Sequence, residues 1–139
     1  MPDVFSKAKR SEIMSRVKSK NTKPEMLLRG TLHRIGFRFR LHSAKLPGKP
    51  DLSFPKYRAV VFVNGCFWHG HGRCRKSALP TSNSEFWKTK IGKNKMRDQK
   101  AYRKLKRLGW RVIVVWECRL MKDAAATAEK VALKIRGKV

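Results

Sequence analysis

Acidic residues are scarce in this sequence. It holds nine Asp and Glu residues against 35 Lys and Arg residues, which gives a formal net charge of +26. This imbalance excludes an electrically neutral surface, and the resulting positive field attracts polyanions, nucleic acid above all. An inert solvated surface and an anionic membrane partner are the alternatives. The size of the charge excess argues against the inert surface.

Long apolar runs are also missing. No segment is apolar over the length that spans a bilayer, and residues 1–20 are polar and basic, without the apolar centre of a signal peptide. We therefore expect a soluble, cytoplasmic protein. With 139 residues, 41% of them apolar, the chain is long enough for one modest core. We divide it into a basic N-terminal arm (1–20), a central domain (21–120) and a basic C-terminal helix or tail (121–139).

There are only three cysteines, and two of them lie in one short loop. Cys66 and Cys74 flank His71, and Cys118 follows a later predicted strand. In a reducing compartment, so few cysteines favour metal binding over disulfides. The four side chains make a complete Cys3His set, which predicts a structural zinc site with no open position. The alternative is a group of buried thiols beside a surface histidine.

The apolar pattern predicts alternating helices and strands. Thr22 and Glu25 are spaced as a capping box, and Gly36 can end the helix that they begin. Residues 37–41 alternate with period two, whereas two later segments are rich in β-branched residues, as buried strands are. We expect a mixed α/β fold around a small sheet. The expected helices are 22–36, 86–108 and 121–139, and the expected strands are 37–41, 51–54, 57–63 and 110–116.

Three side chains are candidates for chemistry. Asp51 opens a predicted strand, and a carboxylate in so basic a chain is a candidate Mg²⁺ ligand. His69 adjoins the predicted zinc loop, and an imidazole can donate and accept protons near neutral pH. The alternatives are a turn carboxylate at Asp51 and a bystander of the metal site at His69. Glu25, the third candidate, has a structural alternative in the capping box with Thr22.

Phe67 and Trp68 are adjacent aromatic residues in a tight loop, where both rings cannot point into one core. Apolar wedges inserted between base steps are a known means of kinking DNA. Met14, in the basic arm, is a third candidate wedge. The alternative is that one ring packs on the sheet, the other covers the zinc, and Met14 is the apolar side of an arm helix.

Several motifs together resemble the very short patch repair (Vsr) endonuclease family. The resemblance runs over residues 3–120, and its most specific segments are Cys66–His69 and Trp116–Cys118. The residues that carry it are Asp3–Val4, Arg10–Ser11, Met14, Glu25, Leu46–Asp51, Tyr57–Arg58, Phe62, Gly65–His69, Glu85–Trp87, Lys90–Asn94, Leu108–Val112 and Trp116–Cys118.

The resemblance implies a restriction-endonuclease-like fold, a mixed sheet flanked by helices with a structural zinc site. It also implies a magnesium-dependent DNA endonuclease, with residues 21–120 as the nuclease domain. Such an enzyme nicks one strand 5′ of the thymine in a T:G mismatch and so starts very short patch repair. Its partner would be mismatched double-stranded DNA, bound by a monomer in the nucleoid of a bacterial cell. Mismatch-repair proteins would be further partners.

The resemblance also implies catalytic roles. Asp51 would bind Mg²⁺ together with the main-chain carbonyl of Val63, His69 would act in acid–base chemistry, and Glu25 would support the site. Three features depart from the family pattern. Asn64 stands where well-known members carry histidine, the loop from His71 to Cys74 is one residue longer, and the C-terminal tail is short and very basic.

The implied DNA contacts fall in three segments. Met14, Phe67 and Trp68 would wedge into the duplex beside the mismatch, and Lys90 and Asn94 would read the mismatched pair. Competing hypotheses are a related restriction-like or homing nuclease that cuts matched duplex, and a non-catalytic zinc-containing DNA-binding protein. An RNA-binding protein is disfavoured, since no aromatic RNA-recognition motif is present.

Overall fold

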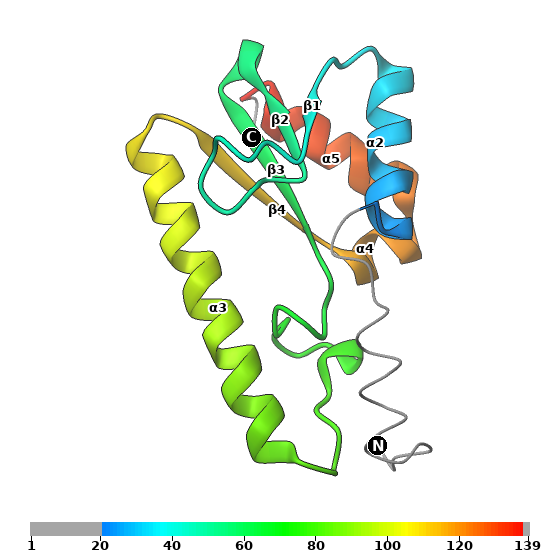
Figure 1. Cartoon of the computed structure of the whole chain (residues 1–139). Helices are drawn as coiled ribbons and strands as arrows, with labels where there is room; N and C mark the ends of the chain where they lie inside the picture. Colours follow the sequence, from blue (N-terminus) through cyan, green and yellow to red (C-terminus); the bar gives the residue numbers. More distant parts are fainter. Residues whose placement is uncertain (1–20, 138–139) are drawn as a thin grey trace.

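The computed structural model describes residues 21–137 of the chain (Figure 1). Met14 and the rest of the predicted arm lie outside these residues. The helices are α2 (Lys23–Ile35), α3 (Ser84–Arg107), α4 (Glu117–Lys122) and α5 (Ala124–Ile135), with short 3-10 turns at Pro55–Tyr57 and Arg75–Ser77. The strands are β1 (Arg40–Leu41), β2 (Leu52–Phe54), β3 (Ala59–Asn64) and β4 (Arg111–Trp116). Among the described residues, no helix has the length and apolar character needed to cross a membrane.

The four strands form one mixed sheet in the order β1-β2-β3-β4. β1 pairs with β2 and β2 with β3 in antiparallel fashion, whereas β3 and β4 run parallel. A parallel pair needs a crossover connection, and here α3 supplies it. The sheet with its flanking helices confirms the predicted mixed α/β fold.

Helices cover both faces of the sheet, with α3 on one side and α2, α4 and α5 on the other (Figure 1). The side chains of β3 alternate between the two layers, as the period of a strand requires. Val60 and Phe62 pack with Tyr102 of α3. Val61 faces the other way, into the larger core that α2 and α5 share, which also contains Leu28. β3 is therefore buried on both sides.

Capping residues account for both ends of α2, whereas the start of α3 has no side-chain cap. Thr22 caps α2, its Oγ1 accepting from the Glu25 N–H at 3.4 Å, and Gly36 ends it with φ 115° in the left-handed region, as predicted. α3 begins after Asn83, whose side chain makes no capping hydrogen bond. The predicted C-terminal helix, 121–139, begins later than expected, as α5 at Ala124, because α4 ends at Lys122 and Asp123 then caps α5 by accepting from the Ala126 N–H.

The predicted strand 37–41 is shorter than expected. Only Arg40 and Leu41 pair with β2, because Phe37 turns inward to the core and stacks edge-on against Phe54 at 5.7 Å. The alternating apolar residues of this segment therefore anchor the chain in the core, and the strand that follows has only two residues. The chain then returns through residues 42–51 to the start of β2, which brings Asp51 close to α2.

Candidate active site and metal centre

The parallel pairing of β3 and β4 places the ends of both strands together. Asn64 at the end of β3 lies opposite Trp116 at the end of β4. The loop that follows β3 carries Cys66, His71 and Cys74, and Cys118 lies in α4 directly after β4. The sheet therefore brings together the four residues predicted to bind zinc.

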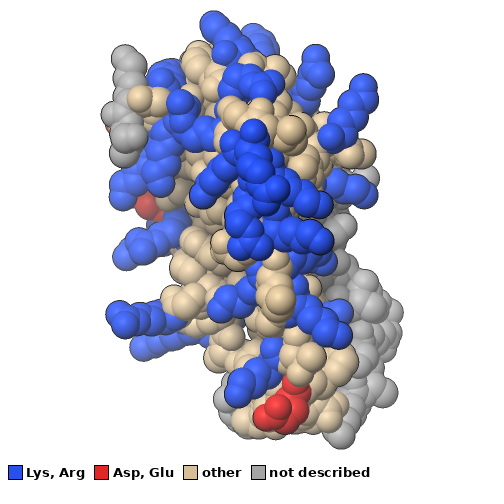
Figure 2. All heavy atoms as spheres, turned by 90° about the vertical axis from the view of Figure 1, so that its left-hand side faces the viewer, with Lys and Arg blue, Asp and Glu red and all other residues tan. Residues whose placement is uncertain are grey.

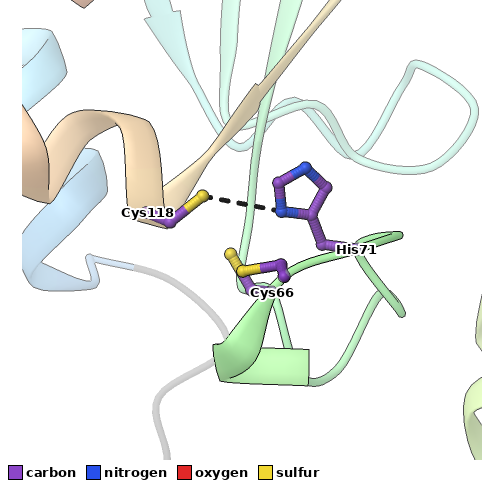
Figure 3. Close-up of side chains that lie close together, drawn as sticks. Cys66, His71 and Cys118 are labelled. Carbon is purple, nitrogen blue, oxygen red and sulfur yellow. Dashed lines mark hydrogen bonds between the residues drawn. The ribbon is translucent and has the colours of Figure 1, made fainter. Parts of the chain in front are cut away.

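The four side chains form a compact metal-ligating group. One ligand atom from each of Cys66, His71, Cys74 and Cys118 lies within 4.8 Å of all the others. Figure 3 shows three of these side chains converging, with the Cys118 Sγ 3.5 Å from the His71 Nδ1. All three cysteines are free. Three thiol sulfurs and one imidazole nitrogen at this separation fit a tetrahedral soft-metal site.

The surroundings of the Cys3His group suit a cation. Burial raises the pKa of the Cys66 thiol to about 12, so that without a nearby positive charge this group stays protonated. Burial also lowers the pKa of His71, which keeps the imidazole in its neutral, metal-binding form. The His71 ring stacks on Trp116 at 4.1 Å, and Glu117 Oε1 accepts a hydrogen bond from the Cys66 N–H at 3.0 Å. These contacts orient the loop, as hydrogen bonds and packing around metal ligands commonly do.

A second group of possible metal ligands lies at the start of α2. Glu25, His42 and Asp51 each offer one atom within 4.8 Å of the others. Glu25 comes from the first turn of α2 and is buried, with 1% of its surface exposed. The His42 Nε2 lies 2.9 Å from Glu25 Oε2 and 4.0 Å from Asp51 Oδ1. The structure therefore brings together two of the predicted catalytic residues.

His42 was not predicted from the sequence. It follows β1 in the left-handed region, with φ 46°, and its N–H donates to the Asp51 carbonyl at 3.1 Å. No motif surrounds it, and its partners are distant in sequence. A histidine in a turn after a short strand carries no local signal of this contact.

Asp51 has an unusual electrostatic environment. Burial, reinforced by the neighbouring Glu25 carboxylate, raises its pKa to about 7, although a hydrogen bond from the Val63 N–H and the nearby His42 oppose the shift. The Val63 N–H donates to Asp51 Oδ2 at 2.7 Å, which fixes the carboxylate against the end of β3. A buried carboxylate that ionises only near neutral pH is one for which a bound cation is especially favourable.

His69 is held by a carboxylate that the sequence did not indicate. Its Nδ1 lies 2.5 Å from Oδ2 of Asp98, on α3. A carboxylate at one ring nitrogen fixes the imidazole and leaves the other nitrogen for chemistry. Asn64 points elsewhere: its buried side-chain amide donates to the Tyr102 hydroxyl at 2.9 Å.

Phe67 and Trp68 belong to a cluster of four aromatic rings. The two rings meet edge to face at 5.2 Å, and both contact Trp87 at the start of α3, at 5.5 and 5.9 Å. Phe86 packs on Trp87 at 5.1 Å and is 57% exposed, whereas Trp87 is buried. Phe67 and Trp68 are half-buried, so their rings support one another while remaining accessible.

One cleft is lined by several of the residues described above. Its lining includes Asp51, His69, Phe67, Trp68, Lys90 and Asn94. The Asn94 side-chain amide donates to the Trp68 carbonyl at 2.9 Å, which ties the aromatic loop to α3. Seen from the α3 side, the molecule presents a surface crowded with Lys and Arg side chains (Figure 2). The arrangement combines a carboxylate–histidine centre with a basic surface suited to phosphates.

Comparisons with known proteins agree with this arrangement. The model of the family described as DNA mismatch endonuclease Vsr matches residues 2–76. The chain is 52% identical over 120 residues to the type II nicking enzyme V.XorIIP of Xanthomonas oryzae, covering 86% of this chain and 88% of that protein. It is 46% identical over 136 residues to V.NmeAIP of Neisseria meningitidis, covering 98% and 96%. It is 45% identical over 120 residues to the DNA mismatch endonuclease Vsr of Escherichia coli, covering 86% and 76%. The chain therefore belongs to the Vsr family of DNA mismatch endonucleases and is a DNA-cleaving enzyme.

Proposed function

We propose that this endonuclease depends on Mg²⁺ and nicks one strand 5′ of the thymine in a T:G mismatch, which starts very short patch repair. The observation that carries the proposal is the shared cleft, because Asp51, His69 and the two half-buried aromatic residues line one space beneath α3. A relative with 45% identity is named a DNA mismatch endonuclease. Cleavage chemistry and distortion of the duplex therefore occur in one place.

In the proposed catalytic centre, the Asp51 carboxylate and the main-chain carbonyl of Val63 hold the metal. Bound Mg²⁺ would supply charge stabilisation to the attacking and leaving oxygens of the phosphodiester. Glu25 supports the site from α2, where it contacts His42. His69, oriented by Asp98, exchanges protons through its Nε2.

Selectivity in this proposal comes from deformation of the DNA. Phe67 and Trp68, together with Met14 outside the described residues, wedge into the duplex beside the mismatch. A T:G wobble pair stacks less well than a correct pair, so opening the stack costs less there. Lys90 and Asn94 read the mismatched pair. Because Asn94 donates to the Trp68 carbonyl, the reading residue is held beside the wedge.

The Cys3His group is proposed to hold one structural zinc ion, since all four ligand positions come from the protein. The basic arm (1–20) and the C-terminal helix or tail (121–139) flank the nuclease domain (21–120) and add phosphate contacts. We propose a monomer that acts in the bacterial cytoplasm on nucleoid DNA, with mismatch-repair proteins as partners.

A second candidate function is nicking of matched duplex. Two relatives are named type II nicking enzymes, without mention of a mismatch. The test uses two duplexes that differ only in one T:G pair, each incubated with and without Mg²⁺. Selective, magnesium-dependent nicking of the mismatched strand is the expected result. Equal cleavage of both duplexes would favour the second function, and binding without any cleavage would favour a non-catalytic DNA-binding protein.

A further inference from the structure

An imidazole lies at the proposed catalytic centre, at a position that none of the implied roles includes. His42 faces both Glu25 and Asp51, and its Nε2 is the atom that approaches both carboxylates. Its side chain is 20% exposed, so solvent and ions can reach it. Asn64 does not supply an alternative side chain, because its amide is engaged by Tyr102 on the opposite face of the sheet.

The distances match those around a shared metal ion. Adjacent ligands of an octahedral ion at about 2.1 Å are separated by about 3.0 Å, and opposite ligands by about 4.2 Å. The His42 Nε2 lies 2.9 and 3.1 Å from the two oxygens of Glu25 and 4.0 Å from Asp51 Oδ1. The separations from the His42 Nε2 to Glu25 and to Asp51 are thus close to those between adjacent and opposite corners of one coordination octahedron.

The Glu25 carboxylate is also oriented as a metal ligand is. Its Oε1 accepts from the Asn21 N–H at 3.1 Å, and its Oε2 accepts from Arg29 Nη1 at 2.8 Å. Ligating carboxylates are commonly held by such outer contacts, which fix their direction and leave further lone pairs for the ion. The positive charge of Arg29 also offsets the repulsion between Glu25 and Asp51.

We propose that the His42 Nε2 and the Glu25 carboxylate are further protein ligands of the catalytic metal, beside Asp51 and the Val63 carbonyl, and that this nitrogen gives the site a preference for Mn²⁺ over Mg²⁺. Mg²⁺ favours oxygen ligands, whereas imidazole nitrogen favours first-row transition ions. The inference rests on the proposed function, because it adds two ligands, Glu25 and His42, to the same metal centre.

The test uses the full chain with its Cys3His site filled with zinc, so that added Mn²⁺ meets only the second group. Pulsed electron paramagnetic resonance detects ¹⁴N bound directly to Mn²⁺, and calorimetry gives the affinities for Mn²⁺ and Mg²⁺. We expect a directly bound nitrogen in the wild type. In His42→Gln, which keeps a donor for Glu25, this coupling should vanish and the ratio of Mn²⁺ to Mg²⁺ affinity should fall on the order of tenfold.

His33→Gln is the matched control, since it makes the same substitution at an exposed histidine of α2. It should leave the nitrogen coupling and the affinity ratio unchanged. Absence of ¹⁴N coupling in the wild type would overturn the inference, as would coupling that persists in His42→Gln, because His69 would then be its source. Thermal unfolding of each variant shows whether a loss of coupling comes from misfolding. Asp51→Ala, which lacks a proposed ligand, should bind Mn²⁺ less tightly than the wild type.

Nicking of the T:G duplex by the same samples separates the two ideas. If nitrogen coupling is present but mismatched DNA is not nicked with either ion, the ligand assignment stands and the proposed function fails. If mismatch nicking occurs but no nitrogen is bound to Mn²⁺, the function stands and His42 is only a hydrogen-bond partner of Glu25.

Discussion

Replacing Asp51 by Asn should make the protein more stable in the absence of Mg²⁺ and should abolish nicking. In the folded state burial raises the Asp51 pKa from 3.8 to about 7, so ionising this carboxyl opposes folding. The cost is absent below pH 3.8, grows as the pH rises between these values and is complete above about 7. Each pKa unit corresponds to about 1.36 kcal/mol, which sets an upper limit of about 4 kcal/mol. The side chain is 16% exposed, so solvent weakens the effect of burial, and we expect about 1–2 kcal/mol.

The assay is thermal unfolding of zinc-loaded protein without Mg²⁺, at pH 8 and pH 5. A gain of about 1–2 kcal/mol in a domain of this size raises the melting temperature by about 3–8 °C. This gain should appear at pH 8 and be less than half as large at pH 5. Glu129→Gln, at an exposed carboxylate of α5, is the control and should show no such dependence on pH. An Asp51→Asn protein that is destabilised equally at both pH values would refute the reasoning.

Four other outcomes are expected. Cys118→Ser should lose bound zinc by elemental analysis and lose folded protein by circular dichroism, because metal binding here contributes folding energy; unchanged melting would contradict a structural site. The affinity for DNA, measured by fluorescence anisotropy, should fall steeply as salt rises, and a flat response would mean that the charge does not contact phosphate. Phe67→Ala and Trp68→Ala should reduce the ratio of T:G to matched nicking, since unstacking costs a few kcal/mol and least at a weak pair; equal slowing on both duplexes would argue against the wedge. Asp98→Asn should slow nicking and change its pH profile while leaving DNA affinity intact, because this carboxylate orients His69; an unchanged profile would remove Asp98 from catalysis.

Sequence reasoning located the parts of the molecule whose chemistry is local. Thr22 and Gly36 bound α2 as expected, since capping depends on the residues immediately around a helix end. The Cys3His set was also found, because cysteines are rare in this chain and their use is restricted to few kinds of site. The roles proposed for Asp51 and His69 came from motifs and from family resemblance.

The sequence could not predict contacts between residues that are far apart in the chain and belong to no motif. His42 meets Glu25 across 17 positions, and Asp98 meets His69 across 29. Neither His42 nor Asp98 has a spacing that marks it, and only the packing of α2 and α3 onto the sheet creates these pairs. The shortness of β1 also results from a contact between distant residues. Phe37 packs against Phe54 in the core, so only the last two residues of the predicted strand pair with β2.

The parallel pairing of β3 and β4 also bears on how the chain folds. The two strands are separated in sequence by the cysteine-containing loop and the whole of α3, so their pairing is non-local, and such contacts form slowly. Cys66 and Cys118 lie just beyond the carboxyl ends of the two strands. A metal ion bound by both sulfurs would join the strands at these ends and shorten the loop that has to close before they pair. Metal supply during synthesis would then affect the rate at which the central strands meet.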